Sequence, residues 1–406
     1  MSDHGVRGGD RPAGGGDRPA GGDDQPAGGD GELLARGGGR PSSEGEEEGE
    51  QEIPRLLLDL LHAKGPSGHE QAPRAVWCEA ASKFAEVSVD SVGTATARVA
   101  AKGGGDGGVR RLLLLGHIDE IGLIVTHIDE SGFIWFREVG GWDPQILVGQ
   151  RVLLCTASGE VEGAIGRKPI HLLREEERKK VAEVRDLHID IGARTEAEAA
   201  QLVAVGDVAV LAGEPARLPN RRLLSRALDN RLGCFAALEA ARMIAEAGGV
   251  AGWEVLAVAA TQEETTFGGS RTSTFALAPD AAIVIDGTHA TDAPGIDVKQ
   301  AGRHDLGSGP VITRGTTLHP RLFELLRAAA ESEGISFTVE ASGRHTGTDA
   351  DAVHISRSGV PTALVSIPLR YMHSPVELVS VADVEACAAL LAAASLRLNR
   401  DTSFAR

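Results

Sequence analysis

The sequence predicts an α/β protein that carries a smaller β-rich domain as an insertion, and three observations support this prediction. From residue 217 onward, helix-like stretches alternate with apolar strand-like runs, which is the pattern of an α/β sheet. Residues 126–216 instead contain short strand-like runs between glycine-rich turns, as a small β domain would. A chain of 406 residues also exceeds the usual size of one hydrophobic core, which favours one large domain with an insertion.

The first 52 residues differ from the rest in composition. They contain an imperfect repeat of Gly, Asp, Pro and Ala, followed by the acidic run SSEGEEEGEQE. Such a segment cannot bury enough apolar surface to offset the loss of chain entropy on folding, so we expect residues 1–52 to be a disordered tail.

From residue 53 the pattern becomes that of a folded domain. Residues 54–63 and 71–85 have the apolar spacing of helices, and the turn sequence GPSGHE separates them. The runs 87–100 and 110–117 predict two strands that the glycine-rich GGGDGG joins as a loose hairpin.

The second half of the chain supplies the rest of the α/β domain. Its predicted helices lie at residues 233–247, 319–334 and 384–398, and its predicted strands at 253–260, 280–286 and 362–368. We therefore expect an α/β domain made of residues 53–125 and 217–398, an inserted β-rich domain at 126–216, and a C-terminal tail at 399–406.

Composition and charge argue against several classes of function. The net charge of −17, without a cluster of Lys and Arg, disfavours nucleic acid as a partner, because phosphate binding needs concentrated positive charge. The longest apolar run, 386–394, is well short of the roughly 20 residues that cross a bilayer. The four cysteines form no C-x-x-C pair, which suits free thiols in a reducing compartment. We therefore expect a cytoplasmic protein without a membrane or nucleic-acid partner.

Potential metal ligands directly follow three of the apolar runs. The runs RLLLLG, LAVAATQ and AAIVI lead into the candidates His117, Asp119, Glu120, Glu263, Glu264 and Asp286. In open α/β sheets, ligands bind in the crevice beyond the carboxyl ends of the strands, so these groups are expected to converge. Asp229, in a polar loop before a helix, and His373, after the last strand, are two further candidates.

This set of residues suits a pair of divalent metal ions. Two ions about 3.5–4 Å apart need a bridging carboxylate, terminal His and carboxylate ligands, and a position for water. His117 and Asp119 point to the same side of an extended segment, so Asp119 could fix the tautomer of a metal-bound imidazole. Glu263 and Glu264 point to different sides, which suits one as a ligand and the other as a general base.

Taken alone, several of these residues have simpler explanations. An aspartate after a strand, such as Asp286, is more often a turn or helix cap, and an isolated Glu-Glu pair is usually a solvated loop edge. Asp349 could hold the amino group of a substrate or cap the following helix. His289 and His345 could approach the site, although a structural role is the simpler interpretation.

Eight motifs, taken in chain order, resemble those of the TET-type dinuclear metallo-aminopeptidases, the glutamyl and deblocking aminopeptidase family. They are GPSGHE, GHIDEIG, GGWDPQ, SRALDNRLGC, TQEETTFGG, DGTHATDAPG, TGTDA and RYMHSPVE. The resemblance extends over residues 53–398. One departure is TTFGG, where the family would have an aliphatic residue followed by Gly, and we leave the side-chain specificity open for that reason.

The resemblance implies a role for each candidate. Two divalent ions, zinc or cobalt, would be bound by five side chains: His117, Asp229, Glu264, Asp286 and His373. Asp229 would bridge the ions, His117 and Asp286 would complete one position, and Glu264 and His373 would complete the other. Glu263 would be the general base, and Asp119 would orient His117.

The resemblance also implies an architecture and an activity. The expected fold is a zinc-peptidase-like three-layer α/β/α core with an inserted small β-barrel-like domain. The expected reaction is hydrolysis of N-terminal residues from peptides with free N-termini, by water that two metals activate. The expected assembly is a homo-oligomer, from a dimer to a hollow dodecamer.

Three alternatives remain open from the sequence. A metallo-deacylase or carboxypeptidase on the same core would need an arginine for the substrate carboxylate, and Arg344 or Arg370 could serve. A glycosidase would need two carboxylates beside a sugar cleft and no metal. The chain could also be a non-catalytic cage that binds peptides.

Overall fold

The computed structural model describes residues 52–103 and 108–405. The predicted disorder of the first 52 residues lies outside the described residues, Glu52 apart, and so does most of the GGGDGG segment. Within the described ranges, no helix has the length and apolar character needed to cross a bilayer.

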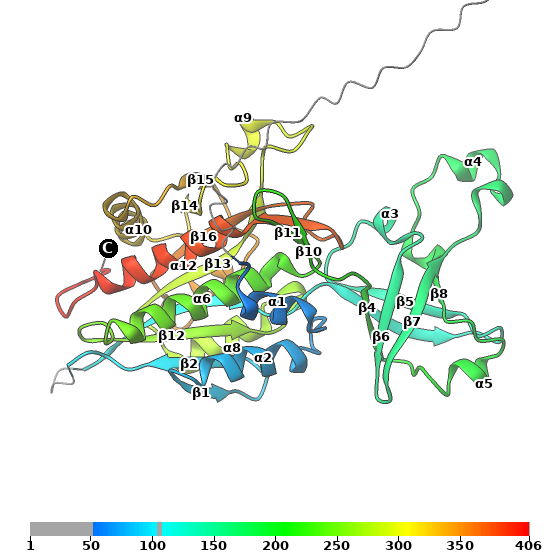
Figure 1. Ribbon diagram of the computed structural model, residues 1–406, viewed down its shortest axis with the longest axis horizontal. Helices are drawn as coiled ribbons and strands as arrows, with labels where there is room; N and C mark the ends of the chain where they lie inside the picture. Colours follow the sequence, from blue (N-terminus) through cyan, green and yellow to red (C-terminus); the bar gives the residue numbers. More distant parts are fainter. Residues whose placement is uncertain (1–51, 104–107, 406) are drawn as a thin grey trace, which may run out of the picture. The chain divides into compact units, whose positions relative to one another are not determined.

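A central sheet of 11 strands forms the larger domain (Figure 1). Its main path runs in the order β1 (Glu86–Val89), β2 (Ala95–Val99), β12 (Trp253–Ala260), β3 (Arg110–His117), β13 (Ala281–His289), β16 (Thr362–Arg370), β17 (Glu377–Ser380), β11 (Arg222–Ser225) and β10 (Ala216–Leu218). Off this path, β14 (Val311–Gly315) pairs with β16 and with β15 (Thr338–Ser342). The neighbouring strands β12, β3, β13 and β16 are parallel, so their carboxyl ends share one edge.

The parallel strands are buried on both faces, which explains their unbroken apolar sequences. In β3, Leu112 and Leu114 join the core on one face of the sheet, while Leu113 and Leu115 join the core on the other. Full burial of one leucine contributes about 2 kcal/mol to folding. A strand sandwiched in this way is a rigid support for the residues that follow it.

Helices cover both faces of the sheet. One face packs against α1 (Arg55–His62), α2 (Gln71–Ala81), α6 (Leu228–Glu246), α10 (Pro320–Glu333) and α12 (Val381–Leu396), and Figure 1 shows α6 and α12 side by side across the strands. The other packs against α8 (Gly268–Leu277) and α11 (Ala350–Val353). Two single-turn helices, α7 (Glu263–Thr266) and α9 (Val298–Ala301), complete the domain. The three-layer α/β/α core expected from the sequence is confirmed.

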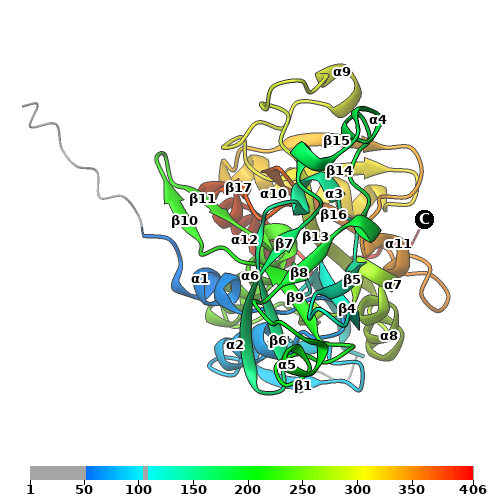
Figure 2. The ribbon, with the colours of Figure 1, turned by 90° about the vertical axis from the view of Figure 1, so that its right-hand side faces the viewer.

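The inserted domain is a closed barrel, and Figure 2 looks onto its strands. Its strands close in the order β4 (Gly122–Ile128), β5 (Ile134–Val139), β8 (His188–Asp190), β7 (Gly159–Gly166), β6 (Arg151–Thr156) and β9 (Val208–Leu211). Short helical turns connect the strands: α3 (Pro144–Leu147), η1 (Ile170–Leu172), α4 (Glu175–Arg178), η2 (Val184–Asp186) and α5 (Glu196–Ala199). The prediction of a small β-barrel is confirmed.

The boundaries of the insertion differ from those expected. The barrel begins at Gly122, so the expected boundary at residue 126 falls inside β4, and residue 216 already belongs to β10 of the sheet. The short segment between β3 and β4 is the sequence IDEI, which contains no Gly or Pro turn. Because no turn residue marks the crossing, the sequence could not locate it.

The hairpin expected between the strands before and after GGGDGG is wrong. Strands β2 and β3 do not pair with each other, because β12 lies between them. β12 runs antiparallel to β2 and parallel to β3. The strands before and after the glycine-rich segment are therefore separated by a strand that comes from much later in the chain.

The C-terminal residues expected to be a tail pack against the α/β domain. The indole of Trp253 donates to the carbonyl of Asn399 at 2.8 Å. The ring of Phe404 makes edge-to-face contacts with Trp253 and His319, at centroid distances of 6.0 and 5.9 Å. This segment seals the amino end of β12 instead of extending into solvent.

Gly116, the residue before His117, lies directly against the backbone of α6. A Cβ atom there would come within 2.6 Å of the Gly233 carbonyl carbon and 2.7 Å of the Cys234 nitrogen. We expect Gly116→Ala to lower the free energy of unfolding by about 1–3 kcal/mol, because the backbone of α6 would have to move. Chemical denaturation measures this, and Gly213→Ala is the matched control, since a Cβ at Gly213 meets no atom within 4 Å. Equal stability of the two variants would contradict the close packing.

Candidate metal centre

The site forms at the carboxyl edge of the parallel strands. His117 is the last residue of β3 and pairs in register with Ala260, the last residue of β12. Glu263 begins α7 three residues later, and Asp286 lies within β13 on the other side of β3. Three strands that are adjacent in space therefore bring together residues that are far apart in the sequence, as expected for an α/β sheet.

Asp229 reaches the site through a break at the start of α6. Asp229 and Asn230 have non-helical backbone angles, with ψ values of 110° and 45°. The side-chain amide of Asn230 donates to the carbonyl of Ile285 at 2.7 Å, which fixes this first turn against β13. The Asp229 side chain is consequently held beside Asp286.

The carboxylate of Asp229 lies between two histidines. Its Oδ1 is 3.3 Å from Nε2 of His117, and its Oδ2 is 3.6 Å from Nε2 of His373. Nε2 of His117 also lies 3.7 Å from Asp286, and Nε2 of His373 lies 3.4 Å from Glu264. Each imidazole thus has Asp229 and one further carboxylate as neighbours, which is the arrangement of two adjacent cation positions.

Glu263 also belongs to this cluster. Its Oε2 is 3.7 Å from Nε2 of His117. Among the described residues, two triplets have one ligand atom each within 4.8 Å of one another: His117, Glu263 and Asp286, and His117, Asp229 and Glu264. The first triplet contains Glu263, the residue expected to be the base, so distance alone does not separate ligand from base at that position.

Burial and like charge shape the electrostatics of the cluster. Burial, together with the neighbouring carboxylates, raises the pKa of Glu263 to about 10 and raises the pKa of Asp286 well above its ordinary value. Although burial opposes the charged imidazole of His373, Glu264 and Asp229 raise its pKa to about 9. Although burial opposes ionisation of Asp229, His117 and His373 hold its pKa below the ordinary value. Bound cations would remove the repulsion among these acids.

The residues present fit divalent cations. Asp229 is 8% exposed, and its Oδ1 is buried without a hydrogen-bond partner. A buried carboxylate oxygen without a donor is costly unless a cation or water meets it. Imidazole nitrogens with carboxylate oxygens are the donor set of zinc and cobalt enzymes.

Asp119 connects the histidine of β3 to the two glutamates. Its carboxylate accepts hydrogen bonds from the backbone N–H groups of Glu263 and Glu264, both at 3.1 Å. Nδ1 of His117 lies 3.3 Å from the Asp119 carbonyl oxygen and 3.5 Å from its carboxylate. Both acceptors are on the Nδ1 side of the ring, so Nε2 is directed to the cluster. The carbonyl is the closer acceptor, which the sequence did not indicate.

The GGWDPQ motif links the barrel to the site. After β5, the carbonyl of Gly141 accepts a hydrogen bond from Nδ1 of His373 at 2.8 Å. A Cβ on Gly140, which has a φ of 79°, would lie 2.5 Å from Ile121 and 3.3 Å from Glu264. Trp142 anchors the loop by donating to the carbonyl of Gly122 at 2.9 Å. The inserted domain therefore contributes to the orientation of a site histidine.

Glu120, grouped by sequence with the candidate ligands, faces away from the cluster. Its Oε1 accepts hydrogen bonds from Arg231 at 2.7 Å and from the backbone of Gly65 at 3.0 Å, and its Oε2 contacts Arg226. Despite burial, Arg226 and Arg231 hold its pKa below the ordinary value. Glu120, one of the potential ligands that follow the strand, is therefore committed to two buried arginines and does not join the cluster.

Sequence reasoning missed Glu377. This residue is 2% exposed, and its carboxylate accepts hydrogen bonds from the backbone N–H groups of Asp229 and His373 at 3.1 and 2.9 Å. The signal was present, because Glu377 closes the RYMHSPVE motif. Its partners are backbone groups of distant residues, so the spacing of the motif did not reveal them.

Asp349 does not cap the helix that follows it. Its side chain makes no cap hydrogen bond to α11 and is 1% exposed. Burial is the largest cause of its raised pKa, about 6, and the carboxylates of Asp119 and Glu264 raise it further. His345 and His289 are exposed at the surface, and neither belongs to the metal-binding triplets.

The arginines offered for a carboxypeptidase do not suit that role. Asp292 engages both Nε and Nη2 of Arg370, at 2.9 and 2.6 Å. A guanidinium held by two parallel hydrogen bonds has its planar fork already occupied. Arg344 is exposed, in a loop after β15.

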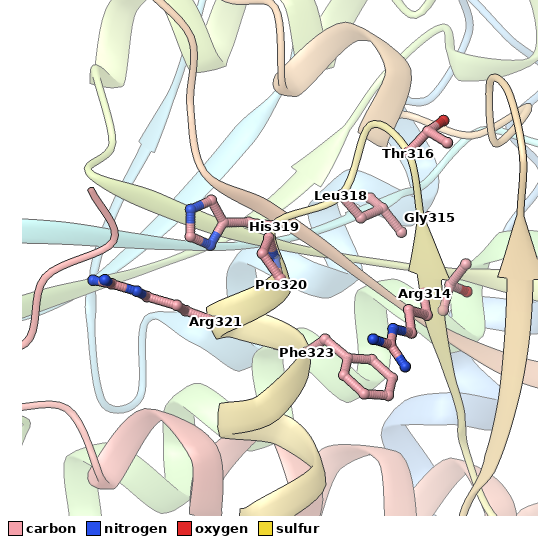
Figure 3. A pocket seen from close by; sticks show the side chains of 9 residues that line it. Arg314, Gly315, Thr316, Leu318, His319, Pro320, Arg321 and Phe323 are labelled. Atoms are coloured by element: carbon pink, nitrogen blue, oxygen red, sulfur yellow. The ribbon is translucent and has the colours of Figure 1, made fainter. Parts of the chain in front are cut away.

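A separate hollow of about 510 Å³ lies between β14 and the start of α10 (Figure 3). The labelled side chains that line it include Arg314, His319, Arg321 and Phe323. It contains none of the carboxylates of the metal centre, so its size does not make it the reactive site. The small hollow that does include Asp229, Glu264, His373 and Glu377 lies between the barrel and the sheet domain.

The crowding of acids predicts that the metal-free protein loses stability as pH rises. The ordinary pKa is 4.5 for Glu263 and 6.5 for His373, and both folded values are higher, about 10 and about 9. At a pH between the ordinary and the raised pKa of each group, the folded state binds more protons than the unfolded state. The free energy of unfolding therefore decreases as pH rises. We expect the melting temperature of chelated protein, measured by calorimetry, to fall from about pH 6.5 to about pH 8.5.

Two controls accompany this measurement. Glu263→Gln has no carboxyl group to titrate at that position, so its melting temperature should fall less steeply. Added Zn²⁺ should stabilise the wild type more at the upper pH than at the lower one. A melting temperature that rises over this range in the metal-free protein would contradict the raised pKa values.

Comparison with known proteins identifies relatives of this chain. The sequence model of the family described as M42 glutamyl aminopeptidase matches residues 97–390. A lysyl aminopeptidase from Pyrococcus furiosus is 33% identical over 334 residues, which cover 81% of this chain and 93% of the relative.

Solved structures give the same result. A TET aminopeptidase from a Thaumarchaeota archaeon is 35% identical with a TM-score of 0.80, covering 85% of this chain and 96% of that one. The Pyrococcus horikoshii TET1 peptidase, described as able to assemble into a tetrahedron or a large octahedral shell, is 31% identical with a TM-score of 0.74 and covers 84% and 99%. The match over most of the sequence and the shared fold confirm the resemblance of the motifs: the chain belongs to the M42 glutamyl aminopeptidase family.

Proposed function

We propose that this protein is a dinuclear metallo-aminopeptidase that removes N-terminal residues from peptides. The related proteins are aminopeptidases, hydrolases that act on peptide bonds. The observation that carries the dinuclear proposal is the position of Asp229, whose two carboxylate oxygens face His117 and His373 at 3.3 and 3.6 Å. A carboxylate placed in this way can bridge two cations.

Five side chains would bind the two ions. Asp229 would bridge them, with His117 and Asp286 at the first position and Glu264 and His373 at the second. Zinc or cobalt fits this set of nitrogen and oxygen donors. When bound, such a pair supplies Lewis acidity that makes water nucleophilic at neutral pH and polarises the peptide carbonyl.

Glu263 is proposed to carry the proton during hydrolysis. It begins α7, and its backbone is fixed by the hydrogen bond to Asp119. Its carboxylate, close to His117, would accept a proton from the attacking water and deliver it to the departing amine. Its neighbour Glu264 lies against His373 and is therefore the better candidate for a ligand.

The geometry favours an aminopeptidase over a carboxypeptidase. A substrate carboxylate needs an available arginine, and Arg370 is engaged by Asp292. The cluster instead presents carboxylates, which would suit a protonated amino terminus. Relatives carry the names lysyl and glutamyl aminopeptidase, and we make no proposal about the preferred side chain.

Assembly and location follow as further parts of the proposal. Solved relatives are described as a dodecamer, a tetrahedron and an octahedral shell, which supports a homo-oligomer here. A cytoplasmic location is supported by the four cysteines, all of which are free.

A substrate panel combined with metal analysis tests the proposal. We expect two divalent ions per chain and cleavage of peptides with a free amino terminus, whether or not the carboxyl terminus is blocked. Acetylation of the amino terminus should abolish cleavage, and chelation should abolish all activity. Cleavage that instead requires a free carboxyl terminus would show a carboxypeptidase, and metal-independent cleavage of glycans would show a glycosidase.

Replacing each glutamate of the pair separates the base from the ligand. Glu263→Gln should retain both ions and reduce kcat by about 10²–10⁴, because only proton transfer is lost. Glu264→Gln should instead lose affinity for one ion. Metal content by atomic emission and kcat on an amino-acid anilide measure the two effects. Substantial turnover by Glu263→Gln would remove that residue from the role of general base.

A further inference from the structure

Glu377 lies between two of the site residues, Asp229 and His373. It is the first residue of β17 and pairs in register with Ser225, the last residue of β11. Four residues after Ser225 the chain reaches Asp229, and four residues before Glu377 it passes His373. Ser225 and Glu377 are therefore paired, and each lies four residues from a site residue.

A single carboxylate holds the backbones of both residues. Oε2 of Glu377 accepts from the N–H of Asp229 at 3.1 Å, and Oε1 accepts from the N–H of His373 at 2.9 Å. Both N–H groups need such an acceptor. Asp229, within the first turn of α6, has a non-helical ψ of 110°, and His373 has a left-handed φ of 59°, so neither residue has regular backbone geometry.

We propose that Glu377 is a positioning residue for the second cation position, the one formed by Asp229, Glu264 and His373. This inference rests on the proposed dinuclear function. The carboxylate of Glu377 sets the distance between the backbones of the bridging aspartate and the terminal histidine. The first position also depends on His117 and Asp286, which are held by β3 and β13 and make no hydrogen bond to Glu377.

The chemistry of this arrangement requires a carboxylate. Both partners are N–H donors, and a carboxylate can accept from both, whereas an amide presents one acceptor and one donor. In Glu377→Gln, the amide nitrogen would face one of the two N–H groups, in a place where Glu377 is 2% exposed and water is scarce. Either Asp229 or His373 would then move away from its present position.

The ring of His373 has a separate support. Its Nδ1 donates to the carbonyl of Gly141 at 2.8 Å, so the barrel loop orients the imidazole. Glu377 instead fixes the position of the His373 backbone. Loss of Glu377 should therefore displace the ligand without disordering the ring completely. A weakened cation position is expected, not an absent one.

Asp383 provides a matched control. It is 1% exposed, and its carboxylate accepts from the backbone N–H groups of Gly307 and Gly309 at 2.8 Å or less. Asp383→Asn therefore breaks the same kind of double hydrogen bond in the same domain. Its partners are not site residues, so it reports the effect on folding alone.

The test is calorimetric titration of the metal-free full-length protein with Co²⁺, together with the cobalt absorption spectrum. Wild type should bind two ions. Glu377→Gln should bind one ion as the wild type does and the other about 10–100-fold more weakly, with an altered spectrum for that ion. Excess Co²⁺ should recover part of the lost kcat. Glu377→Asp, which keeps both carboxyl oxygens, should recover part of the affinity.

Several results would overturn the proposal. One is that Glu377→Gln binds both ions as tightly as the wild type. Another is that Asp383→Asn weakens one ion equally for an equal drop in melting temperature, because Glu377 would then act only through stability. If wild type itself binds a single ion, the dinuclear function fails and this inference fails with it. If wild type binds two ions and Glu377→Gln is unaffected, only the positioning role fails.

Discussion

The structure depends on a concentration of acidic side chains at one edge of a buried sheet. Asp229, Glu263, Glu264 and Asp286 each have a carboxylate oxygen within 3.7 Å of Nε2 of His117 or of His373. Burial of these groups, and secondly the repulsion between their charges, raises the pKa values of Glu263 and Asp286. A fold that retains such a cluster has to supply rigid supports and a compensating charge.

The rigid supports come from the three layers of the sheet domain. β3 is packed on both faces by leucines, and it ends at His117. Two further acids accept hydrogen bonds from backbone N–H groups of the cluster residues. Asp119 accepts from residues of α7, and Glu377 accepts from Asp229 at the start of α6. Neither of these acids is assigned a cation in the proposed centre. Their hydrogen bonds place the loops that bear the candidate ligands.

Two further groups separate the site from its surroundings. Glu120 turns away from its neighbour Asp119 to meet Arg226 and Arg231, so a buried charge network lies beneath the site without joining it. On the open side, the barrel loop with Gly141 touches His373. The barrel therefore helps to orient a site histidine as well as forming a domain of its own, and a displacement of the barrel would change that orientation.

The sequence by itself determined the local features. Runs such as RLLLLG and AAIVI predicted buried parallel strands, because a strand covered on both faces needs apolar residues at every position, and the residues after them included the site residues His117 and Asp286. The motifs indicated the family, because each is a short stretch that can be recognised without knowledge of distant contacts. The fold class and most of the candidate centre were therefore accessible from the sequence.

Tertiary structure alone decided the contacts between distant segments. The placement of β12 between β2 and β3 removed the expected hairpin, and no residue near GGGDGG indicates it. Glu120 and Asp119 are adjacent in the chain and point to different partners, and Glu377 binds backbone groups that leave no side-chain pattern. Hydrogen bonds to backbone and pairings between remote strands depend on where the chain returns in space, and the order of the residues does not record that position.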